Sequence, residues 1–425
     1  MGRGKKRVTP SRYAAVGALV AVERGKHLED ALASFDIKQA NDRAQAWFLA
    51  RGVLQRLGAL DYLIDRWSRK PAAKLDVVPR ACLRLAFFEL RFGRAPERAV
   101  VHEAVEACRA HRAAHAAGFV NAVLRKHDAE VALPDRLSLG HPEWWLTRWE
   151  QRIGLEATKV WAESNNQPKP LTLVQRSGAA DVRALFADQG LELVPSMAAG
   201  EAIPGSFECA ASTGEVSRLA GFEEGAFWVQ DAASTAVADL VSPESGKRVL
   251  DACAGRGGKS FRLADRGFEV VAADRREGAL AQLQDEAGRL GLTIATHRQD
   301  WTDGVPEDWI DAFDAVFLDA PCTALGTLRR HPDVRWTRSA TDPLAMSIRQ
   351  SELLDLVAKC VRPGGQLVYA VCSPEPEEGQ EVAEGFTGRT PLYRLERLWK
   401  SVPPQSNEDA FFGASWIRGR PGELG

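Results

Sequence analysis

The first 126 residues carry hydrophobic positions at helical spacing and show no convincing two-residue alternation. This pattern predicts an all-α domain. Its predicted helices run over Arg12–Arg24, from Asp42 onward, over Val77–Arg91 and Val100–Ala110, and into a last helix that ends with Phe119–His127.

The pattern becomes mixed from about Pro134 to Val241. His141–Trp145 is typical of the start of a helix, Leu171–Arg176 of a strand, and Leu191–Ser196 is a short apolar stretch. We interpret this segment as a small α/β connector domain.

From Gly246 onward, short apolar runs alternate with amphipathic stretches, which is typical of a doubly wound, mostly parallel, Rossmann-like α/β sheet. The predicted strands are Lys247–Gly255, Phe268–Arg275, Ala295–Asp300, Phe313–Cys322 and Gly364–Ser373, with helices at Gly278–Leu290 and Asp342–Val361. The pattern therefore predicts three domains, over residues 1–130, 131–241 and 242–425.

The composition adds that the chain is an ordinary globular one, with 45% hydrophobic and 26% charged residues among 425. No apolar run is long enough for a membrane span, and the N-terminus lacks the apolar core of a secretory signal, so we expect a cytoplasmic protein. The seven cysteines never form C-x-x-C, which argues against a disulfide framework and against a structural metal site.

Charge is distributed unevenly. Through Lys126 the chain has 24 Lys and Arg against 12 Asp and Glu, a surplus of 12, whereas the remainder is acidic. Such a surplus on a short domain is typical of a nucleic-acid-binding surface. The alternative is a solvated helical surface that is merely rich in arginine.

A glycine-rich turn follows the first predicted strand of the C-terminal domain, at Asp251–Ser260. Its glycines allow a tight turn and close approach to a ligand, but they do not form the G-x-G-x-x-G of dinucleotide sites. Asp274 ends the second strand, where a carboxylate accepts hydrogen bonds from a ribose, and Asp300 ends the third, within reach of an adenine amino group. Unless both aspartates merely cap helices, these features favour S-adenosylmethionine as the cofactor.

Two further strand ends deliver cysteines to the same edge. Asp319 and Cys322 close one strand and Cys372 closes another. A single cysteine there is usually a small buried residue, but the pair with a carboxylate suits methylation of cytosine carbon 5. A thiolate that adds to carbon 6 activates carbon 5, the carboxyl group stabilises the adduct, and a cation such as Lys259 favours the thiolate.

Several motifs around these residues occur in a fixed order along the chain. They are WVQDAAS (Trp228–Ser234), CAGRGGKS (Cys253–Ser260), DAPCTALGTLRRHPDVRW (Asp319–Trp336), YAVCS (Tyr369–Ser373) and DAFF (Asp409–Phe412). With them the chain resembles, over nearly its whole length, the bacterial ribosomal RNA cytosine-5 methyltransferases of the Sun (Fmu) type. Its helical domain is similar to the NusB antitermination fold, through DRA at Asp42–Ala44, HEAVE at His102–Glu106 and FVNAVLR at Phe119–Arg125.

The resemblance implies a role for each motif residue. Cys372 would be the nucleophile, Cys322 would help to release the product, and Asp319 would contact both cofactor and target base. The residues implied to hold S-adenosylmethionine are Cys253, Ala254, Gly255, Arg256, Gly257, Gly258, Lys259, Asp274, Asp300 and Asp319. The chain departs from the family at Gly255 and Arg256, which replace alanine and proline, and at Val371, which replaces threonine.

The resemblance also implies that the NusB-like domain binds RNA. In the acidic C-terminal part, a local basic segment follows Cys322, where arginines can pair with phosphates and an indole can stack on a base. Its candidate RNA contacts are Arg329, Arg330, His331, Arg335 and Trp336. The alternative is a surface loop in which the arginines have no such role.

Small-subunit ribosomal RNA is the expected substrate, with transfer RNA as the alternative carrier, and nothing in the sequence demands more than a monomer. A non-catalytic RNA-binding factor with a decayed methyltransferase fold, and a small-molecule or protein methyltransferase, are competing hypotheses. Neither gives a function to both cysteines.

Overall fold

The computed structural model describes residues 8–128, 130–211, 213–402 and 408–420, and the chain packs into two units. The helical unit comprises Met1–Gln167 and Leu328–Ser339, and the sheet unit comprises Pro168–Thr327 and Ala340–Gly425. No helix within the described ranges is long and apolar enough to cross a membrane.

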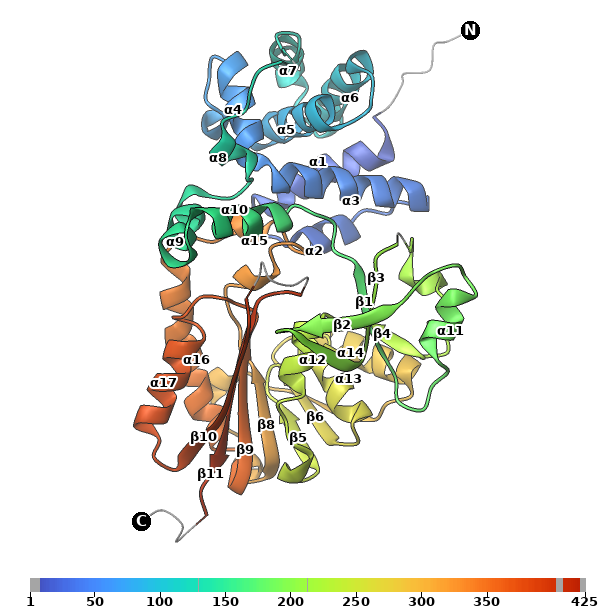
Figure 1. Cartoon of the computed structure of the whole chain (residues 1–425). Coiled ribbons are helices and arrows are strands. Elements are labelled where there is room, and N and C mark those ends of the chain that lie inside the picture. Colours follow the sequence, from blue (N-terminus) through green and yellow to red (C-terminus); the bar gives the residue numbers. More distant parts are fainter. Residues whose placement is uncertain (1–7, 129, 212, 403–407, 421–425) are drawn as a thin grey trace. The chain divides into compact units, whose positions relative to one another are not determined.

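The helical unit confirms the all-α prediction (Figure 1). Its helices are α1 (Pro10–Val22), α2 (Leu28–Ala33), α3 (Ala40–Gln55), α4 (Leu57–Trp67), α5 (Val77–Phe92), α6 (Glu97–Ala110), α7 (Ala117–Leu124), α8 (Asp135–Ser138), α9 (Glu143–Ile153), α10 (Leu155–Ser164) and α15 (Val334–Thr337), with single turns η1 (Ala72–Lys74) and η2 (Ala114–Ala116). Apolar stripes of α1, α3 and α5 meet in one core, and Gly52 of α3 lies so close to Phe88 that a Cβ there would be 2.0 Å from the ring.

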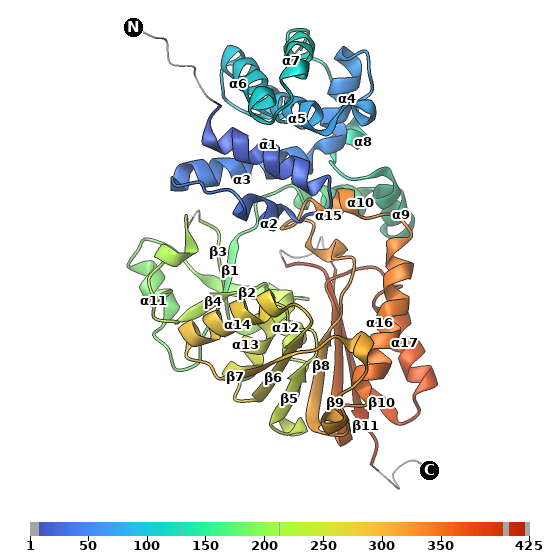
Figure 2. The same ribbon diagram turned by 180° about the vertical axis from the view of Figure 1, so that it is seen from behind.

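The sheet unit contains two sheets, and Figure 2 shows the side opposite to that in Figure 1. An antiparallel sheet has the order β2-β3-β1-β4, from β1 (Leu171–Gln175), β2 (Val194–Ala198), β3 (Glu201–Cys209) and β4 (Phe227–Val229). The larger sheet has the order β10-β11-β9-β8-β5-β6-β7, from β5 (Arg248–Asp251), β6 (Glu269–Asp274), β7 (Ile294–Arg298), β8 (Phe313–Asp319), β9 (Val361–Val371), β10 (Tyr393–Ser401) and β11 (Phe411–Arg418).

The larger sheet confirms the doubly wound prediction and adds an antiparallel edge. Strands β5 to β9 run parallel, whereas β11 pairs antiparallel with β9 and β10. The helices of this unit are α11 (Val182–Ala187), α12 (Ala232–Ala238), α13 (Gly258–Asp265), α14 (Glu277–Leu290), α16 (Asp342–Ala358) and α17 (Gln380–Arg389). Because β8 and β9 alternate residues between two apolar clusters, one on the side of α16 and α17 and one on the side of α12 and α13, both faces of the sheet are buried.

The predicted connector is divided between the two units. Its helices α8 to α10 pack in the helical unit, whereas its strands β1 to β4 form the antiparallel sheet of the sheet unit. The three-domain division at residues 130 and 241 stays a prediction.

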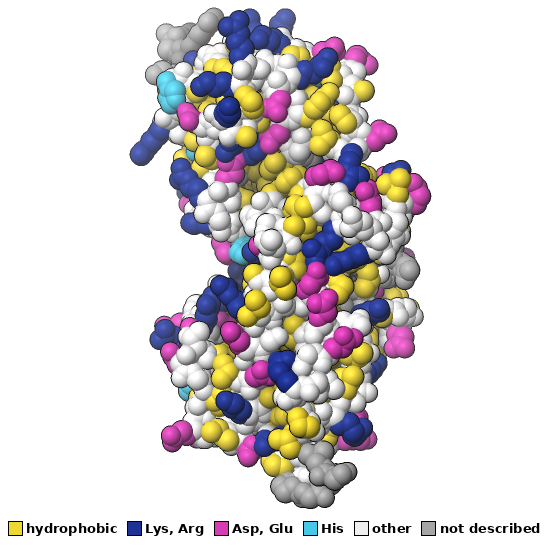
Figure 3. Space-filling model, turned by 90° about the vertical axis from the view of Figure 1, so that its left-hand side faces the viewer, with side chains coloured by type: hydrophobic (Ala, Val, Ile, Leu, Met, Phe, Trp, Pro, Cys, Tyr) yellow, Lys and Arg dark blue, Asp and Glu magenta, His cyan; other side chains and the backbone are white. Residues whose placement is uncertain are grey.

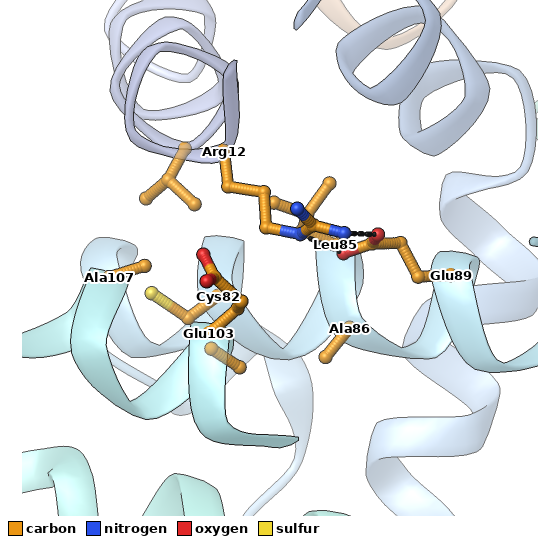
Figure 4. A pocket seen from close by; sticks show the side chains of 9 residues that line it. Arg12, Cys82, Leu85, Ala86, Glu89, Glu103 and Ala107 are labelled. Carbon is orange, nitrogen blue, oxygen red and sulfur yellow. Dashed lines mark hydrogen bonds and ion pairs between the residues drawn. The ribbon is translucent and has the colours of Figure 1, made fainter. Parts of the chain in front are cut away.

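The helical unit carries exposed Lys and Arg side chains on its surface and an ion-paired arginine in its interior. On the face in Figure 3, Lys and Arg side chains gather over this unit. Inside it, Arg12 of α1 forms a buried ion pair with Glu89 of α5 at 2.5 Å, next to a cavity of about 10 Å³ near Cys82 and Ala107 (Figure 4). A cavity of that size holds at most about one water molecule, so it is a packing feature rather than a binding site.

Candidate active site

The carboxyl ends of β5 and β8 mark the point where the larger sheet reverses its winding direction. From β5 the chain proceeds outward through β6 and β7, then returns to place β8 on the other side of β5. Ligands of such sheets bind beyond the strand ends at this point. Asp251 ends β5 and Asp319 ends β8, so the sheet topology brings both carboxylates to this position.

The first turn of α13 supplies partners to both carboxylates. Lys259 Nζ donates to Asp319 Oδ2 at 2.6 Å, and Ser260 Oγ donates to Asp251 Oδ2 at 2.6 Å. Burial alone would lower the pKa of Lys259, but the charge of Asp319 and the hydrogen bond to it outweigh burial and raise the pKa. The predicted cation is therefore held beside the predicted carboxylate.

The backbone conformation of the glycine-rich loop between β5 and α13 requires glycine at two positions. Gly255 and Gly257 have φ of +57° and +91°, and a Cβ on Gly257 would lie 2.5 Å from Leu283 Cγ. The Gly255 amide donates to Asp274 Oδ2 at 2.8 Å, which joins the loop to the end of β6. The substituted Arg256 is exposed on this loop.

Asp251 contributes a buried polar atom that has no protein partner. Its Oδ1 makes no hydrogen bond within the described chain, and burial raises the pKa of Asp251 to about 7. A buried, unsatisfied carboxylate oxygen beside a glycine cradle is a suitable acceptor for a ligand amino group. These residues therefore fit S-adenosylmethionine, which carries both an amino group and a ribose.

The other two predicted cofactor carboxylates differ in their surroundings. Asp274 accepts from the Arg276 amide at 2.8 Å and lies within 3.2 Å of the Arg276 guanidinium; burial would raise the pKa of Asp274, but these donors lower it. Asp300 caps the single turn η5 (Trp301–Asp303) by accepting from the Thr302 amide and hydroxyl. Asp300 therefore caps a helical turn, as the alternative interpretation of the sequence expected. The contact between Asp274 and Arg276 was not predicted from the sequence.

The two predicted catalytic cysteines face each other. Cys322, in the loop after β8, and Cys372, directly after β9, have their sulfur atoms 3.2 Å apart. The hydrogen bond to Cys372 and burial together raise the pKa of Cys322 well above its ordinary value. Cys322 is therefore protonated near neutral pH.

A buried glutamate that the sequence reasoning missed connects the two cysteine loops. Glu378 Oε1 accepts from the Thr323 amide at 2.7 Å, and Oε2 accepts from the Ser373 hydroxyl at 2.5 Å. Gln350 of α16 donates to Oε1 at 3.1 Å. Since Thr323 follows Cys322 and Ser373 follows Cys372, one carboxylate holds both loops together.

A glycine provides the second connection between these loops. In the single turn η7 (Leu325–Thr327), the Gly326 amide donates to the Cys372 carbonyl at 3.0 Å. A Cβ at this position would lie 2.0 Å from the Ala410 carbonyl oxygen. The same Cβ would lie 2.9 Å from the Cys372 carbonyl oxygen, so any larger residue would displace the backbone at Ala410 and at Cys372.

The motifs at Trp228–Ser234 and Asp409–Phe412 meet at a buried lysine. Lys169 Nζ donates to Asp231 Oδ2 at 2.5 Å and also to Asp409. Phe411, two residues after Asp409, lies 5.4 Å from Lys259 Nζ. Lys169 therefore joins the two motifs, and the second motif places Phe411 beside Lys259, an arrangement that sequence spacing does not reveal.

The predicted RNA-binding segment needs a correction, because Arg335 is buried in the helical unit, whereas Trp336 is half-buried there. Arg335 is 1% exposed and donates to the carbonyls of Gly140, Asn165 and Leu328 and to Asn166 Oδ1. Trp336 donates to the Leu54 carbonyl at 2.6 Å and packs against the helical core. The prediction of Arg335 as an RNA contact is wrong, because its guanidinium already binds the protein interior. Trp336 is partly exposed and stays a predicted RNA contact.

The remaining members of that segment are half-buried. Arg329 donates to the Gln167 carbonyl at 3.3 Å, and His331 lies 3.7 Å from Glu29. Arg330 is partly exposed as well. These three residues stay predicted RNA contacts.

The doubly wound sheet, glycine-rich loop and carboxylates at its switch point define an S-adenosylmethionine-dependent methyltransferase. Three family profiles match the chain: "16S rRNA methyltransferase RsmB/F" over residues 238–416, "NusB family" over residues 9–128, and "Methyltr_RsmF/B-like, ferredoxin-like domain" over residues 141–204. The chain belongs to the RsmB/F methyltransferase family, as the sequence resemblance predicted.

Curated relatives and solved structures agree with this assignment. The ribosomal RNA small subunit methyltransferase B of Vibrio cholerae is 33% identical, over 90% of each chain, and that of Klebsiella pneumoniae is 31% identical, over 98% of this chain and 100% of its own. The structure of PH0851 aligns with 97% of this chain and 99% of its own, at 22% identity and a TM-score of 0.82. NSun6 from Pyrococcus horikoshii, crystallised with SFG, aligns with 65% of this chain and 98% of its own, at 17% identity and a TM-score of 0.57, so it shares the fold.

Glu378→Ala is expected to reduce the turnover of methyl transfer roughly 100-fold, because a shift of about 1 Å in a reacting group costs that much. Glu378→Gln should restore activity to within about tenfold, since its amide oxygen can still accept from the Thr323 amide. Single-turnover rates measure the effect, and calorimetry with S-adenosylmethionine should show unchanged affinity in both variants. A wild-type rate in Glu378→Ala would contradict the positioning role.

Asp251→Asn is expected to make thermal stability less dependent on pH. The folded Asp251 keeps its proton up to about pH 7, whereas the unfolded carboxyl loses it near pH 4. The native state therefore binds more protons in this window, and the contribution of Asp251 to stability falls as pH rises from about 4 to 7. Melting temperatures of the unliganded protein from pH 5 to 7 should fall by several degrees more in the wild type than in the variant. Equal slopes would show that Asp251 does not titrate there.

Proposed function

We propose that this enzyme methylates carbon 5 of cytosine in RNA through a covalent adduct with Cys372. The observation that carries the proposal is the pair of sulfur atoms 3.2 Å apart, next to the Asp319–Lys259 ion pair. Methylation of an oxygen or nitrogen atom needs no such thiol pair, because those atoms are already nucleophilic.

Cys372 would act as the thiolate that attacks the base. Its sulfur forms a bond to carbon 6, and the electron pair of the carbon 5–carbon 6 double bond moves onto carbon 5, from which it is delocalised through carbon 4 to N3. Asp319 would accept a hydrogen bond from the N4 amino group and, when protonated, donate one to N3, where negative charge develops. Lys259 provides a nearby positive charge. S-adenosylmethionine, when bound, supplies the methyl group that carbon 5 receives.

Release requires that a base accept the carbon 5 proton, a role assigned to the sulfur of Cys322 once it has lost its own proton to solvent. The electrons of that carbon–hydrogen bond restore the double bond, and the carbon–sulfur bond breaks to give back the Cys372 thiolate. Cys322 lies next to this sulfur and is assigned to this release step. The loop from Cys253 to Lys259, together with Asp274, Asp300 and Asp319, is assigned to cofactor binding.

Small-subunit ribosomal RNA is the proposed carrier of the cytosine. The names of the relatives at 31–33% identity support it, and the surplus of 12 positive charges through Lys126 supports a polyanionic substrate. Transfer RNA is the alternative carrier. Bisulfite sequencing of RNA from a deletion strain distinguishes the two and identifies the cytidine.

Cys372→Ala is expected to abolish methylation, because no other nucleophile is assigned to carbon 6. Transfer of radiolabelled methyl groups to RNA measures it, with calorimetry to verify that S-adenosylmethionine still binds. Cys360→Ala is the matched control, since Cys360 is a buried cysteine of the same unit that belongs to the core. Full activity of Cys372→Ala would refute the covalent mechanism.

Cys322→Ala should slow product release and allow a covalent protein–RNA adduct to accumulate. The adduct would migrate as a slower band on a denaturing gel, and it should be absent from the double variant Cys322→Ala/Cys372→Ala. If the single variant gives no adduct although it methylates RNA, Cys322 has no role in release.

A further inference from the structure

The helical unit contains a groove of about 600 Å³ that no step of the proposed mechanism uses. Its walls come from the end of α4, the turn η1, the start of α5, and α7 with the preceding turn η2. This volume lies within the range of sites that bind small molecules or short ligand segments.

Cations dominate the rim of this groove. Four exposed cations line it, Arg69, Lys70, Lys74 and Lys126, and Asp76 is the one carboxylate among the described residues of its lining. Within the described part of the chain, none of these four cations forms an ion pair.

Other cations of the same helices are already neutralised by the protein. Arg80 of α5 pairs with Glu23, and Arg84 pairs with Glu23 and Asp61. In contrast, no carboxylate of the described chain compensates the charge of the rim cations, so this charge is available to bind an anionic ligand.

Aromatic and aliphatic side chains form the floor of the groove. Trp67 and Phe119 are half-buried there, and Leu75 and Val123 are buried beside them. The Trp67 ring stacks on Phe87 of the core, with ring centres 5.6 Å apart, so it is held in one orientation. Rigid aromatic side chains below a cationic rim are the combination that binds single-stranded nucleic acid, because bases stack on the rings while phosphates meet the cations.

We propose that this groove binds a single-stranded segment of the RNA substrate. The inference rests on the proposed function, since it supplies an anchoring site for the same RNA. An acidic protein segment would also match the rim, but it would leave the aromatic floor without stacking partners. The groove then determines how tightly RNA binds and leaves the chemistry at Cys372 unchanged.

The test compares the triple variant Arg69→Ala/Lys70→Ala/Lys74→Ala with a control that removes three exposed cations away from the groove, Lys38→Ala/Arg94→Ala/Arg98→Ala. The probe is a fluorescein-labelled hairpin of small-subunit ribosomal RNA sequence with a single-stranded tail. Fluorescence anisotropy over a series of salt concentrations gives the affinity and its salt dependence.

The groove variant should bind the probe at least tenfold more weakly at low salt. The slope of log affinity against log salt should decrease by about 2, since each single-strand phosphate contact contributes about 0.7. The control should bind like the wild type, and turnover at saturating RNA should be unchanged in both.

Equal affinity and slope in the groove variant and the wild type would overturn the proposal and favour an acidic protein partner. An equal loss in the control would also overturn it, because the effect would then reflect net charge alone. Failure of the proposed function is a separate result. In that case the wild type forms no 5-methylcytosine, while the groove variant still loses RNA affinity.

Discussion

Parallel hydrogen bonding between β8 and its two neighbours, β5 and β9, determines where the reactive groups of the sheet unit lie. The three strands end at one edge, so Asp251, Asp319 and Cys372 meet there although 121 positions separate the first from the last. This pairing alone does not set sulfur positions to within a few tenths of an ångström, because Cys322 lies in a loop. The buried carboxylate of Glu378 and the close contact of Gly326 provide the missing constraint, since each joins the two cysteine loops.

Charge balance explains why the site tolerates so many acidic groups. Lys259 neutralises Asp319 directly, whereas Asp251 has only the Ser260 hydroxyl as a side-chain donor and stays about half protonated near neutral pH because it is buried. An isolated buried carboxylate would be costly, and protonation avoids that cost. Arrival of a cationic amino group would supply the missing partner and favour loss of the proton. Ligand binding and the titration of Asp251 are therefore coupled.

The sequence predicted the parts of the structure that depend on local periodicity and on strand ends. Runs such as Phe313–Cys322 identified buried strands, and their last residues identified Asp319 and the two cysteines. Glu378 and Lys169 were missed because nothing in their local spacing distinguishes them from surface charges, and their partners come from distant segments. The edge strands β10 and β11 were also missed. The error at Arg335 has a similar cause, since an arginine-rich segment has the same composition whether its guanidiniums face solvent or buried carbonyls.

That error bears on how the positive charge of the helical domain should be interpreted. Arg12, Arg80 and Arg84 are ion-paired inside the helical unit, and Arg335 is surrounded by carbonyl acceptors, with burial lowering its pKa to about 9. Such cations stabilise the fold and contribute little to the attraction of a polyanion from solution. The long-range field acting on a polyanion comes instead from exposed cations that the protein leaves without carboxylate partners. A net surplus of charge indicates a nucleic-acid-binding domain, but only burial and pairing, taken residue by residue, identify which part of its surface carries the field.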